Sequence, residues 1–466
     1  MNPNKNLCFL VCLTCSGCGS ILKTEYTRPV IEFSSSAVKE NKNEELTIKD
    51  QKWWDLFDDT LLSTIISATL QNNNDLHAAA LRLLKSRIES GVINTNIYPD
   101  LDMSFGASSS RSISQSDHTT DSYSSSLSMI YELDLWGKIS RTREQGKWDT
   151  EASEEDLRNT ELLIIESVST KYWSIARFNE QIEFNKNRLD IAKSTYELVK
   201  AKYDNGAGTR SDVLMAEKSI YSTELQLRNI ISQRDNDRST MITIYNKDSI
   251  VHPDERKGLG EFMDIELPLY KPIDIISIRP DIRTAELKIK MAIAGYDLAR
   301  INFWPSVSLG ATINAGSNVF TQWFSEQSLL QSVSATLPLL QWNKLNLQLQ
   351  KERVSVELAI NDFRKSVLNA LSEVENALEA RNKSQYALNV QKKALSISQD
   401  LMKMNEVKYK SGYITFKELL DSQDDVLNQR ISYLDCQYDY LISTMKFLLS
   451  LGGGDVNKEV NDKHGT

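Results

Sequence analysis

Residue types that could support catalysis or metal binding are present in this 466-residue chain, but they are not spaced for either. The four histidines lie in unrelated segments, without the i, i+4 spacing of a helical metal site. Gly258-Leu-Gly260 is not continued into a dinucleotide-binding turn, and no Gly-x-Ser-x-Gly nucleophile elbow occurs. The sequence therefore predicts no catalytic residue, no cofactor and no metal site. The histidines are His77, His118, His252 and His464.

A turn motif that contains a carboxylate occurs twice in the chain, 206 residues apart. In each copy a glycine can take the left-handed conformation that closes one helix. A threonine followed three residues later by a carboxylate is a capping box that opens the next helix. The motif therefore predicts two equivalent helix–turn–helix tips. Its residues are Tyr203, Gly206, Thr209 and Asp212 in the first copy, and Tyr409, Gly412, Thr415 and Glu418 in the second.

The same offset relates two long stretches of the chain. Pro99 matches Pro305 and Trp136 matches Trp342, and no gap is needed over roughly 140 residues. A solenoid repeat is about 20–50 residues long, so this one is a duplicated half-protein. The expected organisation is a first repeat at 56–245, a linker at 246–278, a second repeat at 279–451 and a polar tail at 452–466.

Each repeat contains two runs in which apolar residues alternate with serine-rich polar ones, and these predict β-hairpins at about 101–135 and 305–341. Each run is about 10 residues long, enough for a tilted strand across a bilayer. The alternative is a soluble antiparallel sheet with one wet face. Aromatic residues bracket the runs as membrane-interface anchors would. They include Trp136, Trp304 and Trp342. Gly137 and its equivalent Asn343 suit a left-handed corner between strand and helix.

The remaining pattern is helical. A helix is expected over about 61–97, ended by Tyr98-Pro99. A proline-free pattern from 139 to 205 predicts a helix of about 100 Å, with apolar residues seven apart as in a coiled coil. The second repeat has the same register except at Arg381, and shorter helices return to about Ile244 and Leu451.

The N-terminus has the features of a bacterial export signal. Lys5 precedes a short apolar run, and Ser16-Gly17-Cys18 resembles a lipobox. The prediction is a signal peptide at 1–17, a lipidated Cys18 and an N-terminal tether and equatorial segment at 18–55. An ordinary cleaved signal with an incidental cysteine is the alternative. The net charge of −9, without a basic cluster, argues against nucleic acid as a partner.

Together these residues resemble the TolC-like outer-membrane efflux proteins, in the lipoprotein branch that serves RND-type pumps. The resemblance rests on Cys18, Trp53-Trp54-Asp-Leu-Phe57, Glu132-Leu-Asp-Leu-Trp-Gly-Lys138 and the two turn motifs. It implies an α+β membrane protein that forms a homotrimer. Each protomer would give four strands to a shared 12-stranded outer-membrane β-barrel, continuous with a long periplasmic α-helical barrel. Closing the sheet across three copies would leave no strand edge in lipid.

The resemblance also implies a function as the exit duct of a tripartite export system, with a periplasmic adaptor and an inner-membrane RND-type pump as partners. Matching the turn motif, Glu418 and Asp421 fall on acidic aperture positions, and Asp212 and Arg210 are weaker candidates from the first copy. Tyr409, with Tyr203 as its equivalent, falls on a tyrosine of the links that close the channel. Capping is the alternative role for Glu418 and Asp212.

Two further functions remain open on the sequence. One is the duct of a type I protein secretion system, which the same architecture would serve. The other is a lipid-anchored coiled-coil spacer of the periplasm, which would need the helices but not serine-faced strands.

Overall fold

The computed structural model describes residues 22–29, 53–111, 119–246, 255–260, 265 and 278–453. The predicted signal peptide at 1–17, Cys18, most of the predicted linker and the tail from 454 onward lie outside these ranges. The chain forms two compact units. The strand unit comprises Met1–Glu32, Leu81–Glu155 and Arg283–Lys365. The hairpin unit comprises Phe33–Ala80, Asp156–Ile282 and Ser366–Thr466.

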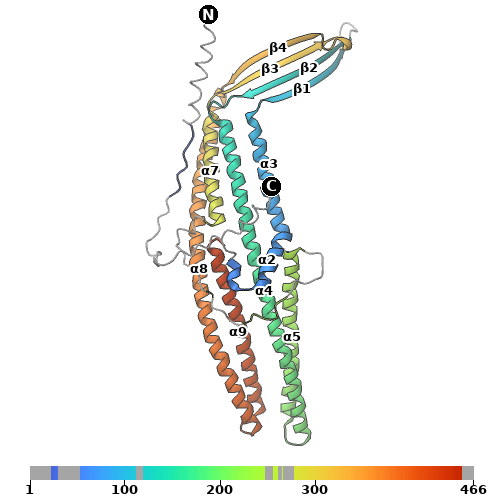
Figure 1. The fold of residues 1–466 in the computed structure, drawn as a ribbon, viewed down its shortest axis with the longest axis vertical. Coiled ribbons are helices and arrows are strands. Elements are labelled where there is room, and N and C mark those ends of the chain that lie inside the picture. Colours follow the sequence, from blue (N-terminus) through green and yellow to red (C-terminus); the bar gives the residue numbers. More distant parts are fainter. Residues whose placement is uncertain are drawn as a thin grey trace. The chain divides into compact units, whose positions relative to one another are not determined.

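The strand unit contains a four-stranded antiparallel sheet in the order β1-β2-β3-β4 (Figure 1). The strands are β1 (Asp100–Arg111), β2 (Thr119–Glu132), β3 (Ser306–Ser317) and β4 (Glu326–Thr336). The central pair, β2 and β3, joins the two repeats. Because strand residues alternate between faces, the register produces one apolar row and, one residue further along, one polar row. The apolar row is Met103, Leu127, Ile313 and Leu329, and the polar row is Ser104, Ser126, Asn314 and Ser328.

Neither face of the two outer strands is covered. All twelve residues of β1 and all eleven of β4 are exposed, including large apolar side chains such as Met103, Phe105 and Val333. A soluble sheet would bury one face against a core, so the apolar row is presented to an environment other than this chain.

The passage from β2 into the long helix α4 (Lys138–Asp204) is built by two residues. Gly137 adopts a left-handed φ of +78°. Asp134 accepts hydrogen bonds from the backbone N–H groups of Ile139 and Ser140 at 2.8 and 2.9 Å, which caps the helix. The expected left-handed corner is therefore present in the first repeat. In the second repeat the expectation is wrong, because Asn343 lies inside α8 (Trp342–Lys410).

The helix expected over 61–97 is divided in two. α2 (Thr60–Asn72) and α3 (Asn74–Asn94) meet at Asn73, whose backbone is extended. The Asn73 side chain accepts hydrogen bonds from the N–H groups of Asp75 and Leu76, so it caps α3. Its amide also donates to the Ile244 carbonyl at 2.7 Å, which ties the break to the end of α5 (Arg210–Tyr245).

The other helices are α7 (Pro280–Ile301) and α9 (Phe416–Ser450). Short 3₁₀ turns occur at Trp53–Phe57, Thr95–Ile97, Phe320–Gln322 and Leu339–Gln341. α4 contains 67 residues and α8 contains 69, which corresponds to about 100 Å each at 1.5 Å per residue. Across the described residues, none of the helices is both long and apolar enough to cross a membrane.

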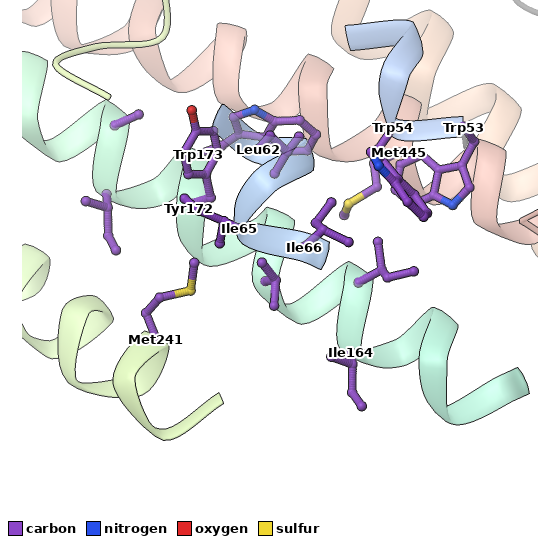
Figure 2. Close-up of a cluster of buried hydrophobic side chains, with 14 of the residues drawn as sticks. Trp53, Trp54, Leu62, Ile65, Ile66, Ile164, Tyr172, Trp173, Met241 and Met445 are labelled. Atoms are coloured by element: carbon purple, nitrogen blue, oxygen red, sulfur yellow. The ribbon is translucent and has the colours of Figure 1, made fainter. Parts of the chain in front are cut away.

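The main core of the hairpin unit gathers residues of α2, α4, α5 and α9 together with Trp53 and Trp54, which lie at one side of the cluster (Figure 2). Trp53 and Trp54 are each 1% exposed and pack edge to face with ring centroids 5.7 Å apart. Phe57 lies 4.8 Å from the ring of Trp173 on α4. Burial of aromatic rings of this size contributes strongly to the stability of a core. The Trp53–Phe57 segment therefore attaches the N-terminal part of the chain to the helices.

Candidate functional site at the helical turns

The two turns that end the long helices have the same backbone geometry. Gly206 closes α4 with φ +73° and Gly412 closes α8 with φ +76°. In each turn the residue after the glycine donates its N–H to a carbonyl five residues earlier, Ala207 to Lys202 at 2.8 Å and Tyr413 to Lys408 at 2.9 Å. This is the Schellman arrangement, which satisfies the last carbonyls of a helix.

Each following helix opens with a complete capping box. The Thr209 hydroxyl accepts from the Asp212 N–H at 3.2 Å, and Asp212 accepts from the Thr209 N–H at 3.3 Å. In the second copy the Thr415 hydroxyl accepts from the Glu418 N–H at 3.3 Å, and Glu418 accepts from the Thr415 N–H at 2.7 Å. Hydrogen bonds from the Thr415 backbone and side chain lower the pKa of Glu418.

The two tips pack against each other through a small apolar cluster. Val199 on α4 and Val213 and Ala216 on α5 are buried with Phe416 and Leu419 of α9. These residues flank the turns directly, so the tips form one body within a single chain. A change that separates the two hairpins must open this cluster.

The two equivalent tyrosines differ in their surroundings. Tyr409 is half-buried and accepts a hydrogen bond from the Lys202 ammonium at 3.3 Å, while that ammonium also lies 4.5 Å from the centre of its ring. Its ring is 5.8 Å from that of Phe416. Tyr203 is 40% exposed, and its side chain has no hydrogen-bond partner in the described part of the chain. Of these two tyrosines, Tyr409 is therefore the one whose side chain makes a hydrogen bond between the hairpins within the described residues.

The acidic residues of the second tip follow one another along the first turns of α9. Glu418, Asp421 and Asp424 are spaced by three residues, which places them on neighbouring parts of one helix face. All three are exposed. Glu418 is engaged by the cap, and Asp424 forms an ion pair with Arg188 of α4. Within the described ranges, Asp421 makes no hydrogen bond or ion pair.

Arg210 of the first tip is exposed and also has no ion-pair partner among the described residues. Asp212 is partly buried by its own capping box. The structure therefore brings Glu418 and Asp421 together on one helix and places Arg210 and Asp212 on the other hairpin.

A set of charged links above the tips joins α4 to α9. Arg177 pairs with Asp435 at 3.1 Å, and Glu180 pairs with Arg430 at 2.9 Å. Burial and the neighbouring Asp439 raise the pKa of Asp435, against the lowering effect of Arg177. The sequence patterns did not predict these links, nor did they predict the contact of Lys202 with Tyr409 or of Arg188 with Asp424. The signal that could have found Arg188 is its position next to Leu189, a buried member of the apolar residues that recur every seven positions in α4.

In the strand unit the predicted aromatic anchors form pairs beside the ends of the strands. The Trp136 indole N–H donates to the Pro305 carbonyl at 2.8 Å, and its ring lies 4.6 Å from that of Trp304. Trp342 packs edge to face on Phe303 at 4.9 Å. Trp304 and Trp342 keep about half of their surface exposed, as rings at a membrane interface would.

In the described part of the chain no three His, Cys, Asp or Glu side chains are arranged to hold a metal ion.

The sequence model of the family described as "Outer membrane efflux protein" matches residues 65–246 and 274–453, which fall on the two repeats and make up most of the chain. The chain belongs to this family.

Individual relatives span nearly the whole of this efflux protein. The probable outer membrane lipoprotein SilC of Salmonella typhimurium is 25% identical over 452 residues, which cover 94% of this chain and 96% of that one. The cation efflux system protein CusC of Escherichia coli K12 is 24% identical over 462 residues, covering 97% and 100%. The crystal structure of the open state of the Neisseria gonorrhoeae MtrE outer membrane channel matches with a TM-score of 0.84 at 24% identity, covering 93% and 98%.

The predicted fold class, with an internally duplicated chain, four strands and long helical hairpins, is confirmed by these matches. The protein is an outer-membrane efflux channel, and it resides in the outer membrane. The family is one of transport channels rather than of enzymes.

Proposed function

We propose that this channel is a homotrimer and that it forms the exit duct of a tripartite efflux system. A periplasmic adaptor would dock on its helical tips, and an inner-membrane pump of the RND type would supply the energy. The observation that carries the proposal is the open sheet. In the order β1-β2-β3-β4, β1 and β4 each pair on one side only within the described ranges of the chain.

An open sheet edge is not tolerated in lipid, because its N–H and C=O groups would have no partners. Pairing β4 of one copy with β1 of the next would remove every edge, and three copies would close a twelve-stranded barrel. The uncovered apolar row of the sheet supports this assembly, since its members would face the lipid and the serine row would face the lumen.

The helices of the hairpin unit carry a second set of apolar residues that this chain leaves uncovered. Ile191 and Leu198 on α4 are seven residues apart, as are Leu214 and Tyr221 on α5. α8 presents Tyr386, Val390, Ile397, Leu401 and Met404. Exposed residues at heptad spacing indicate a second coiled-coil seam. Neighbouring copies of the same chain would cover it.

The tips would close the periplasmic end of the duct. Three copies would bring three Asp421 carboxylates into one ring, where they attract cations and repel each other. Glu418 adds its charge while capping α9, and Asp212 and Arg210 belong to the other hairpin of the tip. Tyr409 and Lys202 would link the two hairpins in the closed state, with Tyr203 exposed beside them. Opening requires a partner that binds the separated hairpins better.

Lipidation of Cys18 would anchor the N-terminal tether in the membrane. The lipobox supports this, and so does the similarity to SilC, a probable outer membrane lipoprotein. The lipid would add hydrophobic anchoring to that of the strands.

Single-channel conductance in a planar bilayer tests the proposal. Purified full-length channel is expected to give small, cation-selective steps. Asp421→Asn should enlarge the steps and reduce the cation selectivity, because the closed ring loses its charge. Asp425→Asn is the matched control, since it removes the same charge one turn further along α9, where Asp425 accepts a hydrogen bond from Ser398 at 2.6 Å.

Equal effects of the two substitutions would contradict the assignment of Asp421 to the aperture. No conductance at any voltage, from protein that migrates as a folded heat-modifiable trimer, would contradict the duct itself and favour a lipid-anchored spacer.

A further inference from the structure

A short N-terminal segment, Leu22–Pro29, lies against α4 and α7 of the strand unit. It begins four residues after Cys18. Leu22, Thr24 and Tyr26 are buried or half-buried, whereas Lys23, Glu25 and Thr27 are exposed. This alternation is the pattern of an extended chain that turns one side toward a surface. We call Leu22–Pro29 the docked tether.

The centre of the contact is a buried ion pair that the docked tether completes. Arg141 of α4 donates to the Asp297 carboxylate of α7 at 2.7 and 2.9 Å, and both residues are at most 4% exposed. Thr24 donates its N–H to one carboxylate oxygen at 2.9 Å and its hydroxyl to the other at 2.5 Å. The Thr24 carbonyl accepts from Arg141 at 3.2 Å. A buried ion pair needs such additional partners, because desolvation is costly.

Two outer contacts extend the site. Glu286 of α7 accepts a hydrogen bond from the Tyr26 hydroxyl at 3.0 Å and forms an ion pair with Arg28, also at 3.0 Å. Burial and the Glu286 carboxylate raise the pKa of Tyr26, so its hydroxyl remains a donor at neutral pH. Lys23 pairs with Glu144 of α4 at 2.6 Å. A site with charged partners on two helices is more specific than a chance contact of an unstructured segment.

The order of contacts gives the direction of the docked tether. Thr24 meets Asp297, whereas Tyr26 and Arg28 meet Glu286, which lies 11 residues earlier in α7. The tether therefore runs antiparallel to α7. The N-terminal end of the docked tether is therefore the end nearer to the C-terminus of α7, which Trp304 and β3 follow.

The distances fit a lipid anchor at the aromatic pair. Thr24 lies six positions after Cys18, and an extended chain of that length reaches about 20 Å. Asp297 lies four residues before the end of α7 at Ile301, about 6 Å along the helix axis at 1.5 Å per residue, and Trp304 follows three residues later. Cys18 is therefore within reach of the level of Trp136 and Trp304.

We propose that α4 and α7 form a docking site for the tether, in which Asp297, Arg141 and Glu286 hold Leu22–Pro29 and so place the lipid chain of Cys18 at the membrane interface beside Trp136 and Trp304. The proposal rests on the proposed lipidation of Cys18. It makes the lipid a positioned part of the folded channel, since the bonds at Thr24 lie only six residues from the modified cysteine.

The test uses substitutions in the tether, which leave the Arg141–Asp297 pair in place. Thr24→Pro removes both donors, Thr24→Ala removes only the hydroxyl, and Thr24→Ser keeps both and is the control. Amide hydrogen exchange of residues 22–29 in the full-length channel should be slow in the wild type and in Thr24→Ser. It should rise about tenfold or more in Thr24→Pro, with Thr24→Ala between them.

The second measurement reports on the position of the anchor. In a Cys436→Ser background, a spin label at exposed Glu25→Cys should be immobile and close to the lipid interface. Thr24→Pro should make the label mobile and lower the yield of membrane-assembled trimer several-fold. A wild-type tether that exchanges as freely as that of Thr24→Pro would overturn the docking site. If Thr24→Pro releases the docked tether but changes neither the mobility of the label nor the yield of trimer, the positioning role would be wrong.

The mass of the N-terminal peptide separates this proposal from the one on which it rests. A wild-type peptide without lipid on Cys18, together with slow exchange at residues 22–29, would contradict the lipidation but support the docking site. The proposed role in positioning the lipid would then be wrong.

Discussion

At the scale of single residues, the two helical turns require glycine because of their backbone conformation. Gly206 and Gly412 have left-handed φ values, and an added Cβ would meet no atom within 4 Å at either position. Their role is therefore backbone freedom and not close packing. An L-residue in this region costs roughly 1–2 kcal/mol.

Gly412→Ala is expected to raise local opening of the α8–α9 turn by about five- to thirtyfold, in line with that cost. Amide hydrogen exchange of the turn in purified channel measures it. Gly91→Ala is the matched control, because Gly91 lies inside α3 with open space around it and no left-handed φ. There alanine should be neutral or stabilising. Equal increases in opening at both sites would refute the conformational role.

The two tyrosines give a second residue-scale prediction. Tyr409→Phe removes the hydrogen bond from Lys202 and keeps the ring contact, so a small increase in conductance is expected. Lys202→Met removes both and should have the larger effect. Tyr203→Phe should change nothing, because the described structure gives its hydroxyl no partner. An equal increase in conductance for Tyr203→Phe and Tyr409→Phe would contradict the prediction. The hydrogen bond from Lys202 would then not be what holds the channel closed.

Local signals predicted the caps well and the long-range partners poorly. A capping box is contained within four residues, so Thr415 and Glu418 could be identified from the sequence alone. Arg381 only interrupted the heptads. In the structure it donates to the Ile265 carbonyl at 2.7 Å, a linker residue 116 positions away that no local pattern indicates.

At the scale of elements, the start of α9 depends on an ionised carboxylate. Glu418 has a lowered pKa in the fold because Thr415 donates to it. Its contribution is therefore complete above its ordinary value of about 4.5 and is lost as pH falls through the lower folded value.

Hydrogen exchange at the first turn of α9 should accelerate as the pH falls below about 4.5, beyond the intrinsic pH dependence of exchange. Glu418→Gln keeps an acceptor for the cap but does not titrate, so its exchange should follow only the intrinsic dependence over the same window. A variant as pH-dependent as the wild type would assign the effect to another carboxylate.

Element ends were predicted where the ending signal is local and missed where it is tertiary. The expected helix at 139–205 agrees closely with α4, because Gly137 and Gly206 stand at its two ends. The break at Asn73 was not predicted, since asparagine occurs in helices and this one is held by the distant Ile244 carbonyl. Asn343 shows the opposite case, in which the repeat predicted a corner that the second half does not form.

At the scale of the whole molecule, duplication and strand content were readable from the sequence, but the sheet order was not. Alternation predicts each strand and proximity predicts each hairpin. The pairing of β2 with β3 joins residues nearly 200 positions apart, and one chain alone does not show what covers β1 and β4. In the proposed trimer, the outer partners of β1 and β4 are strands of the neighbouring copies.

The exposed heptad positions of α8 give the prediction at this scale. Ile397→Glu places a charge on the uncovered seam, whereas Gln399→Glu adds the same charge about 200° around the same helix, at roughly 100° per residue. If neighbouring copies cover Ile397, its substitution buries an unpaired carboxylate at three equivalent contacts. The heat-modifiable trimer should then be lost in Ile397→Glu and kept in Gln399→Glu. Because Ile397 is exposed in the single chain, folding of the protomer should not suffer, and far-ultraviolet circular dichroism should remain helical. Trimers that persist in Ile397→Glu would mean that this seam meets the periplasmic adaptor instead of a second copy.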